Sequence, residues 1–264
     1  MTDFGEFFCF RAGELVRQIG DAASEVQLEV ADSWLVEDGR VRDLGAHFER
    51  FRRWAIEFDP QCSDQLPHFF DAVIAATPMN GRWFPRIEFH AESGHGEHLY
   101  LRMRQAPAPT PTMTLWTNPE PDPRENPLVK GPDLSLGMQL RRAAQMHGAD
   151  EAVLLTAEGL VAEGALSSLV WWRGDVLCAP GDDIPWLESV TRNQVFAIAD
   201  SMGLETRFES VVPSELIGLE IWGLSSLQGI RLVTDWVDLN GAVGQPKYFE
   251  SFAKRLRLLA SSIV

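Results

Sequence analysis

The sequence predicts a two-domain protein of the mixed α+β or α/β class, with a small N-terminal and a larger C-terminal domain. Its 264 residues, 45% of them hydrophobic, suffice for one large or two modest cores. Apolar residues recur with helical and with strand spacing on both sides of a proline-rich run. That run, at 105–132, holds eight prolines, which disfavour helices and central strands. We therefore expect domains at 1–108 and 127–264, with an interdomain connection at 109–126.

The N-terminal half alternates short strands with two helices. Val26, Leu28 and Val30 alternate with polar residues, as in a strand. Gly39 separates two apolar segments and indicates a hairpin turn, and Asp43 stands where it can cap a helix. The remaining expected elements are a helix with an apolar face from Leu44 to Ala55, a helix at 69–75, and strands at 87–89 and 99–103.

The C-terminal half reads as an α/β domain. A helix that begins near Leu136 is expected to end at Gly148, and a second helix is expected to end at Gly203, because glycine is common just past a helix C-terminus. The other expected elements are a strand at 152–155, a hairpin at 168–178 and a final amphipathic helix from 249 to 263.

Charge and cysteine content exclude several classes. The net charge of −15 and the lack of a basic stripe argue against nucleic-acid binding. No apolar stretch approaches the ~20 residues of a membrane span. Cys9, Cys62 and Cys178 are odd in number and widely spaced, so they imply neither a disulfide framework nor a metal site. With no signal peptide at the N-terminus, we expect a cytoplasmic protein with no metal.

Several motifs occur in a fixed order. The sequence reads GADEAVLL at 148–155, EGLVAEGALSSL at 158–169, LESVTR at 187–192 and HFERF at 47–51. Together they resemble the class IV, or fold type IV, aminotransferase family that uses pyridoxal 5′-phosphate (PLP). This family includes branched-chain and D-amino-acid aminotransferases and 4-amino-4-deoxychorismate lyase. The resemblance covers about residues 28–235. It implies a C-terminal pseudo-barrel, PLP in the cleft between the domains, and a homodimer whose partner subunit completes the pocket.

The resemblance assigns two residues to the reactive part of the cofactor. Lys130 is implied to hold PLP as a Schiff base and to relay the substrate's α-proton. Few lysines compete, since only Lys130 and Lys247 precede residue 253. Glu163 is implied to pair with the pyridine nitrogen and keep it protonated. In an alternating strand Val161 and Glu163 would share one face, so we expect Glu163 to point inward among apolar neighbours.

The resemblance also implies residues for the phosphate and the substrate. A phosphate suits the amides at a helix start, where the sequence places Val190 and Thr191 after Ser189, which is also a good N-cap. The remaining phosphate candidates are Ser225, Ser226 and Arg50, and the substrate candidates are Arg104 and Leu227, with Arg86 and Arg102 as weaker alternatives to Arg104.

Three functions remain open from the sequence. The first is an aminotransferase that moves an amino group between an amino acid and an oxo acid. The second is a lyase like 4-amino-4-deoxychorismate lyase, which would release pyruvate and 4-aminobenzoate; the short chain suits its compact size. The third is a PLP-binding protein without catalysis, suggested by Ser189 and Leu224, which depart from the commonest family residues. Lys130 and Glu163 favour the first two.

Overall fold

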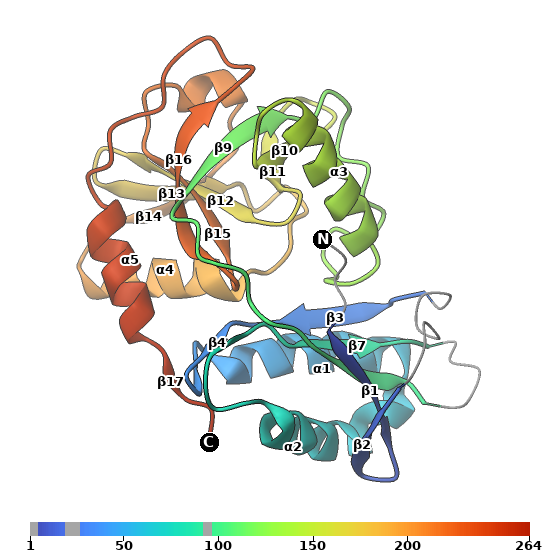
Figure 1. The fold of residues 1–264 in the computed structure, drawn as a ribbon. Coiled ribbons are helices and arrows are strands. Elements are labelled where there is room, and N and C mark those ends of the chain that lie inside the picture. The colour runs from blue at the N-terminus through green and yellow to red at the C-terminus, as the bar shows by residue number, and fades with distance from the viewer. Residues whose placement is uncertain (1–4, 19–26, 92–96) are drawn as a thin grey trace. The chain divides into compact units, whose positions relative to one another are not determined.

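The structure is a computed structural model that describes residues 5–18, 27–91 and 97–264 (Figure 1). The chain forms two compact units. Unit 1 comprises Met1–Ala108, Val129–Pro132 and Leu259–Val264, and unit 2 comprises Pro109–Leu128 and Asp133–Leu258. Among the residues described, no helix combines the length and apolar character needed to cross a membrane.

Unit 1 is built on a five-stranded antiparallel sheet with the strand order β2-β1-β8-β7-β3. Its strands are β1 (Glu6–Arg11), β2 (Glu14–Arg17), β3 (Val30–Ser33), β7 (Arg86–Phe89) and β8 (Leu99–Met103). The predicted strands at 87–89 and 99–103 are confirmed. β3 begins at Val30, the last residue of the strand predicted from 26 to 30, and Val26 lies outside the described residues.

The helices α1 (Leu44–Phe58) and α2 (Leu66–Ala76), joined by the 3-10 helix η1 (Pro60–Asp64), pack on this sheet. α1 begins where predicted, since the Asp43 side chain accepts a hydrogen bond from the Ala46 amide (3.2 Å). Phe51 from α1, Phe69 from α2 and Leu101 from β8 are fully buried together in the core of this unit. The predicted helices of the N-terminal half are thus confirmed.

A second small sheet of unit 1 involves the end of the chain and corrects one prediction. Its order is β17-β5-β4-β6, with β4 (Val36–Glu37), β5 (Arg40–Val41), β6 (Arg82–Trp83) and β17 (Ser261–Ser262). The prediction of a final helix that reaches residue 263 is wrong for residues 259–263, because α5 (Phe249–Leu258) ends earlier. Ile263 is buried in the core of unit 1, and its amide donates to Gly39 O (2.9 Å). These tertiary contacts outweigh the helical spacing of the apolar residues.

Unit 2 contains an eight-stranded mixed sheet with the order β11-β10-β9-β16-β15-β12-β13-β14. Its strands are β9 (Thr112–Thr117), β10 (Glu151–Leu155), β11 (Val161–Gly164), β12 (Ser168–Arg173), β13 (Val176–Pro180), β14 (Thr206–Glu209), β15 (Ile221–Ser225) and β16 (Gly229–Trp236). The sheet is curled, because β11 lies against β12 and β13 although β10, β9, β16 and β15 separate them in the strand order. Val153, Trp171 and Val233 are buried in one apolar cluster. The predicted pseudo-barrel is therefore present as a half-barrel.

β9 differs from its prediction. It lies inside segment 109–126, which was predicted to be a connection, yet it pairs in parallel with β10 on one side and β16 on the other. β9 contains no proline; the prolines of this segment lie just before and just after the strand. The prediction relied on the proline content averaged over the whole segment and therefore missed a central strand.

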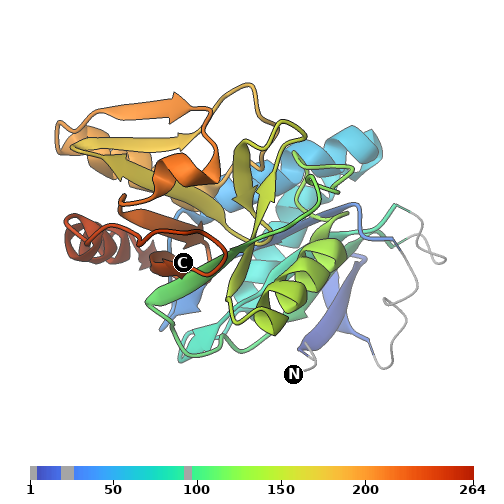
Figure 2. The same cartoon turned by 90° about the horizontal axis from the view of Figure 1, so that it is seen from above.

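Three helices cover the sheet of unit 2. α3 (Leu134–Met146) lies along β9 and β10, and is yellow-green in Figure 2. α4 (Val190–Ser201) and α5 pack against each other and against β15 and β16, as Figure 1 shows. The short 3-10 helix η2 (Pro213–Leu216) completes the unit. α3 and α4 confirm the two predicted helices, and β12 and β13 confirm the predicted hairpin.

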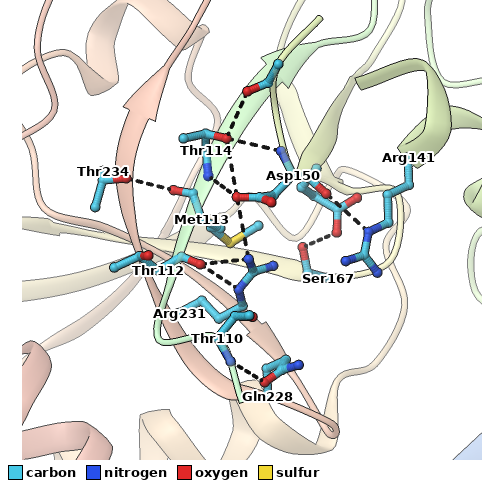
Figure 3. Close-up of polar contacts among 12 residues, drawn as sticks. Thr110, Thr112, Met113, Thr114, Arg141, Asp150, Ser167, Gln228, Arg231 and Thr234 are labelled. Carbon is cyan, nitrogen blue, oxygen red and sulfur yellow. Dashed lines mark hydrogen bonds and ion pairs between the residues drawn. The ribbon is translucent and has the colours of Figure 1, made fainter. Parts of the chain in front are cut away.

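Polar contacts fix the start of β9 between its neighbours (Figure 3). Asp150 Oδ2 accepts from the Thr114 amide (2.9 Å) and from Thr114 Oγ1 (3.3 Å). From β16, Arg231 donates through Nε (2.9 Å) and Nη2 (2.7 Å) to Thr112 O. These bonds satisfy backbone groups that a parallel strand leaves unpaired at its end.

The burial of Ile263 predicts that the chain end stabilises unit 1. Replacing Ile263 by Ala should lower the free energy of unfolding by about 2–4 kcal/mol, because it removes buried methyl groups and leaves a cavity. Urea unfolding followed by circular dichroism measures this change. Val264→Ala is the matched control, since Val264 is 81% exposed and should change the value by less than about 0.5 kcal/mol. Equal effects of the two substitutions would contradict the observed packing.

Candidate active site

Lys130 is held against the start of β3. Its carbonyl oxygen accepts a hydrogen bond from the Ala31 amide (2.6 Å). A Cβ on Gly131 would lie 2.7 Å from Glu29 O and 2.8 Å from Val30 Cα, so only glycine permits this close approach. Although predicted in the C-terminal domain, Lys130 belongs by its contacts to unit 1.

A buried charge cluster lies near Lys130 within unit 1. Asp32 is fully buried and accepts from His47 Nδ1 (2.8 Å) and from Arg50 Nε (2.7 Å) and Nη2 (2.8 Å). Burial opposes ionisation of Asp32, but the charges of Arg50 and His47 outweigh it and lower its pKa. Burial lowers the pKa of His47, and the charge of Lys130 contributes to that shift. Arg50 is therefore a buried member of this cluster.

Glu163 lies on β11 with its side chain 6% exposed. Its Oε1 accepts from Arg124 Nη1 and from the Leu187 amide (3.2 Å). Among the residues that the structure describes, none is bonded to the other oxygen, Oε2. Burial raises the pKa of Glu163, and the charge of Arg124 opposes that rise.

The surroundings of Glu163 differ in one respect from the strand prediction. The β10–β11 pairing shifts, so that Leu154 faces Glu163 but Leu155 faces Val161. Because Leu154 and Leu155 point to opposite faces, Val161 and Glu163 do as well. Val161 packs in the apolar cluster inside the half-barrel, whereas Glu163 contacts Arg124. The expectation that these two residues share a face is therefore wrong.

Arg124 and Asp122 were not indicated by the motifs. Arg124 lies with its side chain 8% exposed and bonds both carboxylates, Asp122 and Glu163. Burial disfavours its charge, but these two partners outweigh burial and raise the pKa of Arg124. The signal in the sequence was a charged Asp-Pro-Arg step inside the proline-rich run, which composition alone presented as a linker.

The start of α4 offers backbone amides. Ser189 caps the helix by accepting from the Arg192 amide (3.2 Å), as predicted. Among the described residues, the amides of Val190 and Thr191 have no acceptor, although both residues are buried. Arg192 stacks its guanidinium over the Trp186 ring, 3.4 Å from the centroid, and burial lowers the pKa of Arg192 to about 10.

The second predicted phosphate turn lies between β15 and β16. Ser225 Oγ accepts from the Gln228 amide (3.2 Å) and so stabilises the turn. Ser225, Ser226 and Leu227 are all half-buried. α4 packs on β15, the strand that ends at Ser225.

Of the arginines considered for the substrate, Arg86 lies on β7 and Arg102 on β8 of unit 1, and Arg104 directly follows β8. Arg104 donates from Nε to Phe84 O (3.0 Å) and stacks over the Phe84 ring. Arg86 and Arg102 both donate to Glu88, at 2.7 Å and 3.0 Å. Burial opposes ionisation of Glu88, but the His90 hydrogen bond and the charges of Arg86 and Arg102 lower its pKa to about 2.

One buried acid of unit 2 has no role in the predicted site. Glu151 accepts a hydrogen bond from Ser167 Oγ (3.1 Å); Ser167 is labelled in Figure 3. Burial raises the pKa of Glu151 to about 7, against the opposing charge of Arg141. Its carboxyl group is therefore one that changes charge near neutral pH.

This raised pKa predicts how stability depends on pH. The unfolded chain loses this proton near pH 4.5 and the folded chain near pH 7, so wild-type stability should fall as pH rises between these values. Glu151→Gln keeps the shape and removes the titration. Relative to Glu151→Gln, wild type should lose on the order of 2–3 kcal/mol over that window. Urea unfolding at pH 5, 6, 7 and 8 measures the difference, and a difference that stays constant with pH would refute the assignment.

Comparisons with known proteins agree with the motifs. The family model described as amino-transferase class IV matches residues 29–236. No curated protein matches the chain in sequence. A hypothetical aminotransferase from Mycobacterium tuberculosis in its PLP-bound form superposes with a TM-score of 0.79 at 20% identity, over 97% of this chain and 98% of that chain.

Two further solved structures have the same fold. A branched-chain aminotransferase from Thermoproteus uzoniensis with norvaline gives a TM-score of 0.78 at 17% identity, covering 98% of this chain and 99% of that chain. The Escherichia coli branched-chain amino acid aminotransferase gives 0.76 at 15% identity, covering 97% and 94%. The predicted fold class is therefore confirmed. The family model spans most of the sequence, and the chain belongs to the class IV aminotransferase family of enzymes.

Proposed function

We propose that the chain is a PLP-dependent aminotransferase that moves an amino group between an amino acid and an oxo acid. Membership of the class IV family supports this function. The observation that carries it is the state of Glu163, a buried carboxylate with Oε1 bonded twice and Oε2 bonded to no described residue. A protonated pyridine nitrogen is a cationic donor that suits such an oxygen.

Polar groups of unit 2 offer hydrogen-bond partners for both ends of PLP. Glu163 offers an acceptor for the ring nitrogen, and the Val190 and Thr191 amides offer donors for a phosphate at the start of α4. The Leu187 amide bonds Glu163 two residues before the Ser189 cap. This bond ties the Glu163 carboxylate to the segment that begins α4. A rigid cofactor that is bound at both its ring nitrogen and its phosphate would need these two groups to be held in a fixed relation.

In this proposal each residue has one task. Bound PLP supplies an electron sink for the α-carbon of an amino acid. Lys130 would hold the cofactor as a Schiff base, and its Nζ would move the α-proton of the substrate. Glu163 would hold the proton on the ring nitrogen. The groups that would hold the phosphate are Ser189, Val190, Thr191, Ser225, Ser226 and Arg50, and those that would contact the substrate are Arg104 and Leu227.

The alternative of a 4-amino-4-deoxychorismate lyase is not favoured. The solved structures that superpose on this chain are named as aminotransferases, and none of those described above is named as a lyase. A lyase would release pyruvate from aminodeoxychorismate with no oxo acid present. That assay is the direct check on this alternative.

The proposal also includes the assembly and the location of the enzyme. The family resemblance supports a homodimer, which light scattering would detect as twice the chain mass of 29.5 kDa. Cys9, Cys62 and Cys178 are buried free thiols, which supports a reducing compartment such as the cytoplasm. The domain boundaries near 108 and 127 remain part of this proposal.

The central prediction concerns Lys130. Purified enzyme with PLP should show a visible band at about 410–430 nm that borohydride removes, because a lysine holds the cofactor. An amino acid alone should convert this band to that of the aminated cofactor, as a half-reaction. Lys130→Ala should lose the band and reduce transamination by at least about 1,000-fold.

Lys254→Ala is the matched control, because Lys254 is exposed on α5, and it should retain both the band and the activity. If Lys130→Ala keeps the borohydride-sensitive band, Lys130 is not the attachment site. If wild type binds PLP but no amino acid changes the band, the enzyme is not an aminotransferase.

A further inference from the structure

An arginine outside the sequence motifs holds the Glu163 carboxylate. Arg124 Nη1 and the Leu187 amide both donate to Glu163 Oε1. We propose that Arg124, anchored by Asp122, is a positioning residue that keeps Glu163 ionised and leaves its Oε2 for the ring nitrogen of PLP. This inference rests on the proposed function, since Arg124 acts on the cofactor only through Glu163.

Asp122 fixes the orientation of Arg124. Arg124 donates from Nε to Asp122 Oδ1 (2.9 Å) and from Nη2 to Asp122 Oδ2 (2.6 Å). The Asp122 amide in turn donates to Leu155 O (2.8 Å) at the end of β10, the strand that pairs with β11. Pro121 and Pro123 flank Asp122 and restrict the backbone of the loop. Arg124 therefore reaches Glu163 from a fixed point on the same sheet.

Charge complementarity indicates what the cluster is suited to bind. Asp122, Arg124 and Glu163, joined by direct bonds, carry a formal charge of −1. Arg192 acts on Glu163 only at longer range and also interacts with Glu188 and Asp182. A pyridinium cation beside Oε2 would make the bonded cluster neutral, whereas a neutral ring would leave a buried negative charge uncompensated.

Arginine is the side chain that this geometry needs. Its Nε and Nη2 donate together to the two oxygens of Asp122, and Nη1 donates to Glu163, so all three nitrogens of the planar guanidinium are used. A lysine supplies the positive charge but cannot make this two-pronged contact with Asp122. Without the cation, burial favours the neutral form of Glu163, and of its two bonded donors only the Leu187 amide still favours the ionised form. A neutral carboxyl would no longer hold the proton on the ring nitrogen.

The test compares PLP with its analogue in which C–H replaces the ring nitrogen. Tryptophan fluorescence gives both dissociation constants. Wild type should prefer PLP by about tenfold or more, because a charge-assisted hydrogen bond contributes only to PLP. Arg124→Met should reduce this preference to about twofold or less, as should Glu163→Gln, and Arg124→Lys should lie between Arg124→Met and wild type. Since each ratio is measured within one variant, a general loss of folded protein cancels.

Arg141→Met is the matched control, because Arg141 donates to Asp150 O (3.2 Å) and not to Glu163; it should keep the wild-type ratio. A wild-type ratio in Arg124→Met, or equal weakening of both compounds, would overturn the inference. If Arg124→Met does not fold, Asp122→Asn provides the same comparison with a smaller expected change. If wild type binds PLP and the analogue equally well, the inference about Arg124 fails but the proposed function does not. If wild type binds neither compound, the proposed function fails as well.

Discussion

The function proposed for unit 2 depends on keeping one buried carboxylate, that of Glu163, ionised. Removing Glu163 from water favours its neutral form, so the surrounding groups must supply the compensation that water would give. The fold does so with a guanidinium and a backbone amide on the same oxygen. Both donors come from loops, at Arg124 and Leu187, while the carboxylate itself stands on a strand. A buried acid that described residues bond through one oxygen only is suited to hold a cationic ring through the other.

The half-barrel explains why these groups meet. β11 is the edge of the sheet in pairing order, yet the curl carries it against β12 and β13. β10 then fixes both sides of the ion pair, because it pairs with β11 and also accepts the Asp122 amide through Leu155 O. β9 lies beside β10 in the centre of the sheet, and the hydrogen bond from the Thr114 amide to Asp150 fixes the register between these two strands. The ion pair is therefore a consequence of sheet geometry and not of flexible surface side chains.

Much of the fold could be predicted from local patterns, and the failures have physical causes. Asp43, Gly148 and Gly203 marked helix ends correctly because capping is a local effect. Ile263 escaped prediction because its burial depends on distant residues. β9 was hidden by the prolines around it. Of the proposed site, the family resemblance implied Lys130 and Glu163 with their neighbours, but not Arg124, whose proposed role rests on a contact with a residue 39 positions away along the chain. Spacing could not show that contact.

The most direct test of this account is the protonation of the cofactor's ring nitrogen, since an ionised Glu163 is useful only if it pairs with a pyridinium. Nitrogen-15 NMR of the enzyme carrying PLP labelled at that nitrogen distinguishes the two forms by chemical shift. The account predicts the shift of a protonated ring near neutral pH. The shift of a neutral pyridine in fully bound enzyme would contradict it.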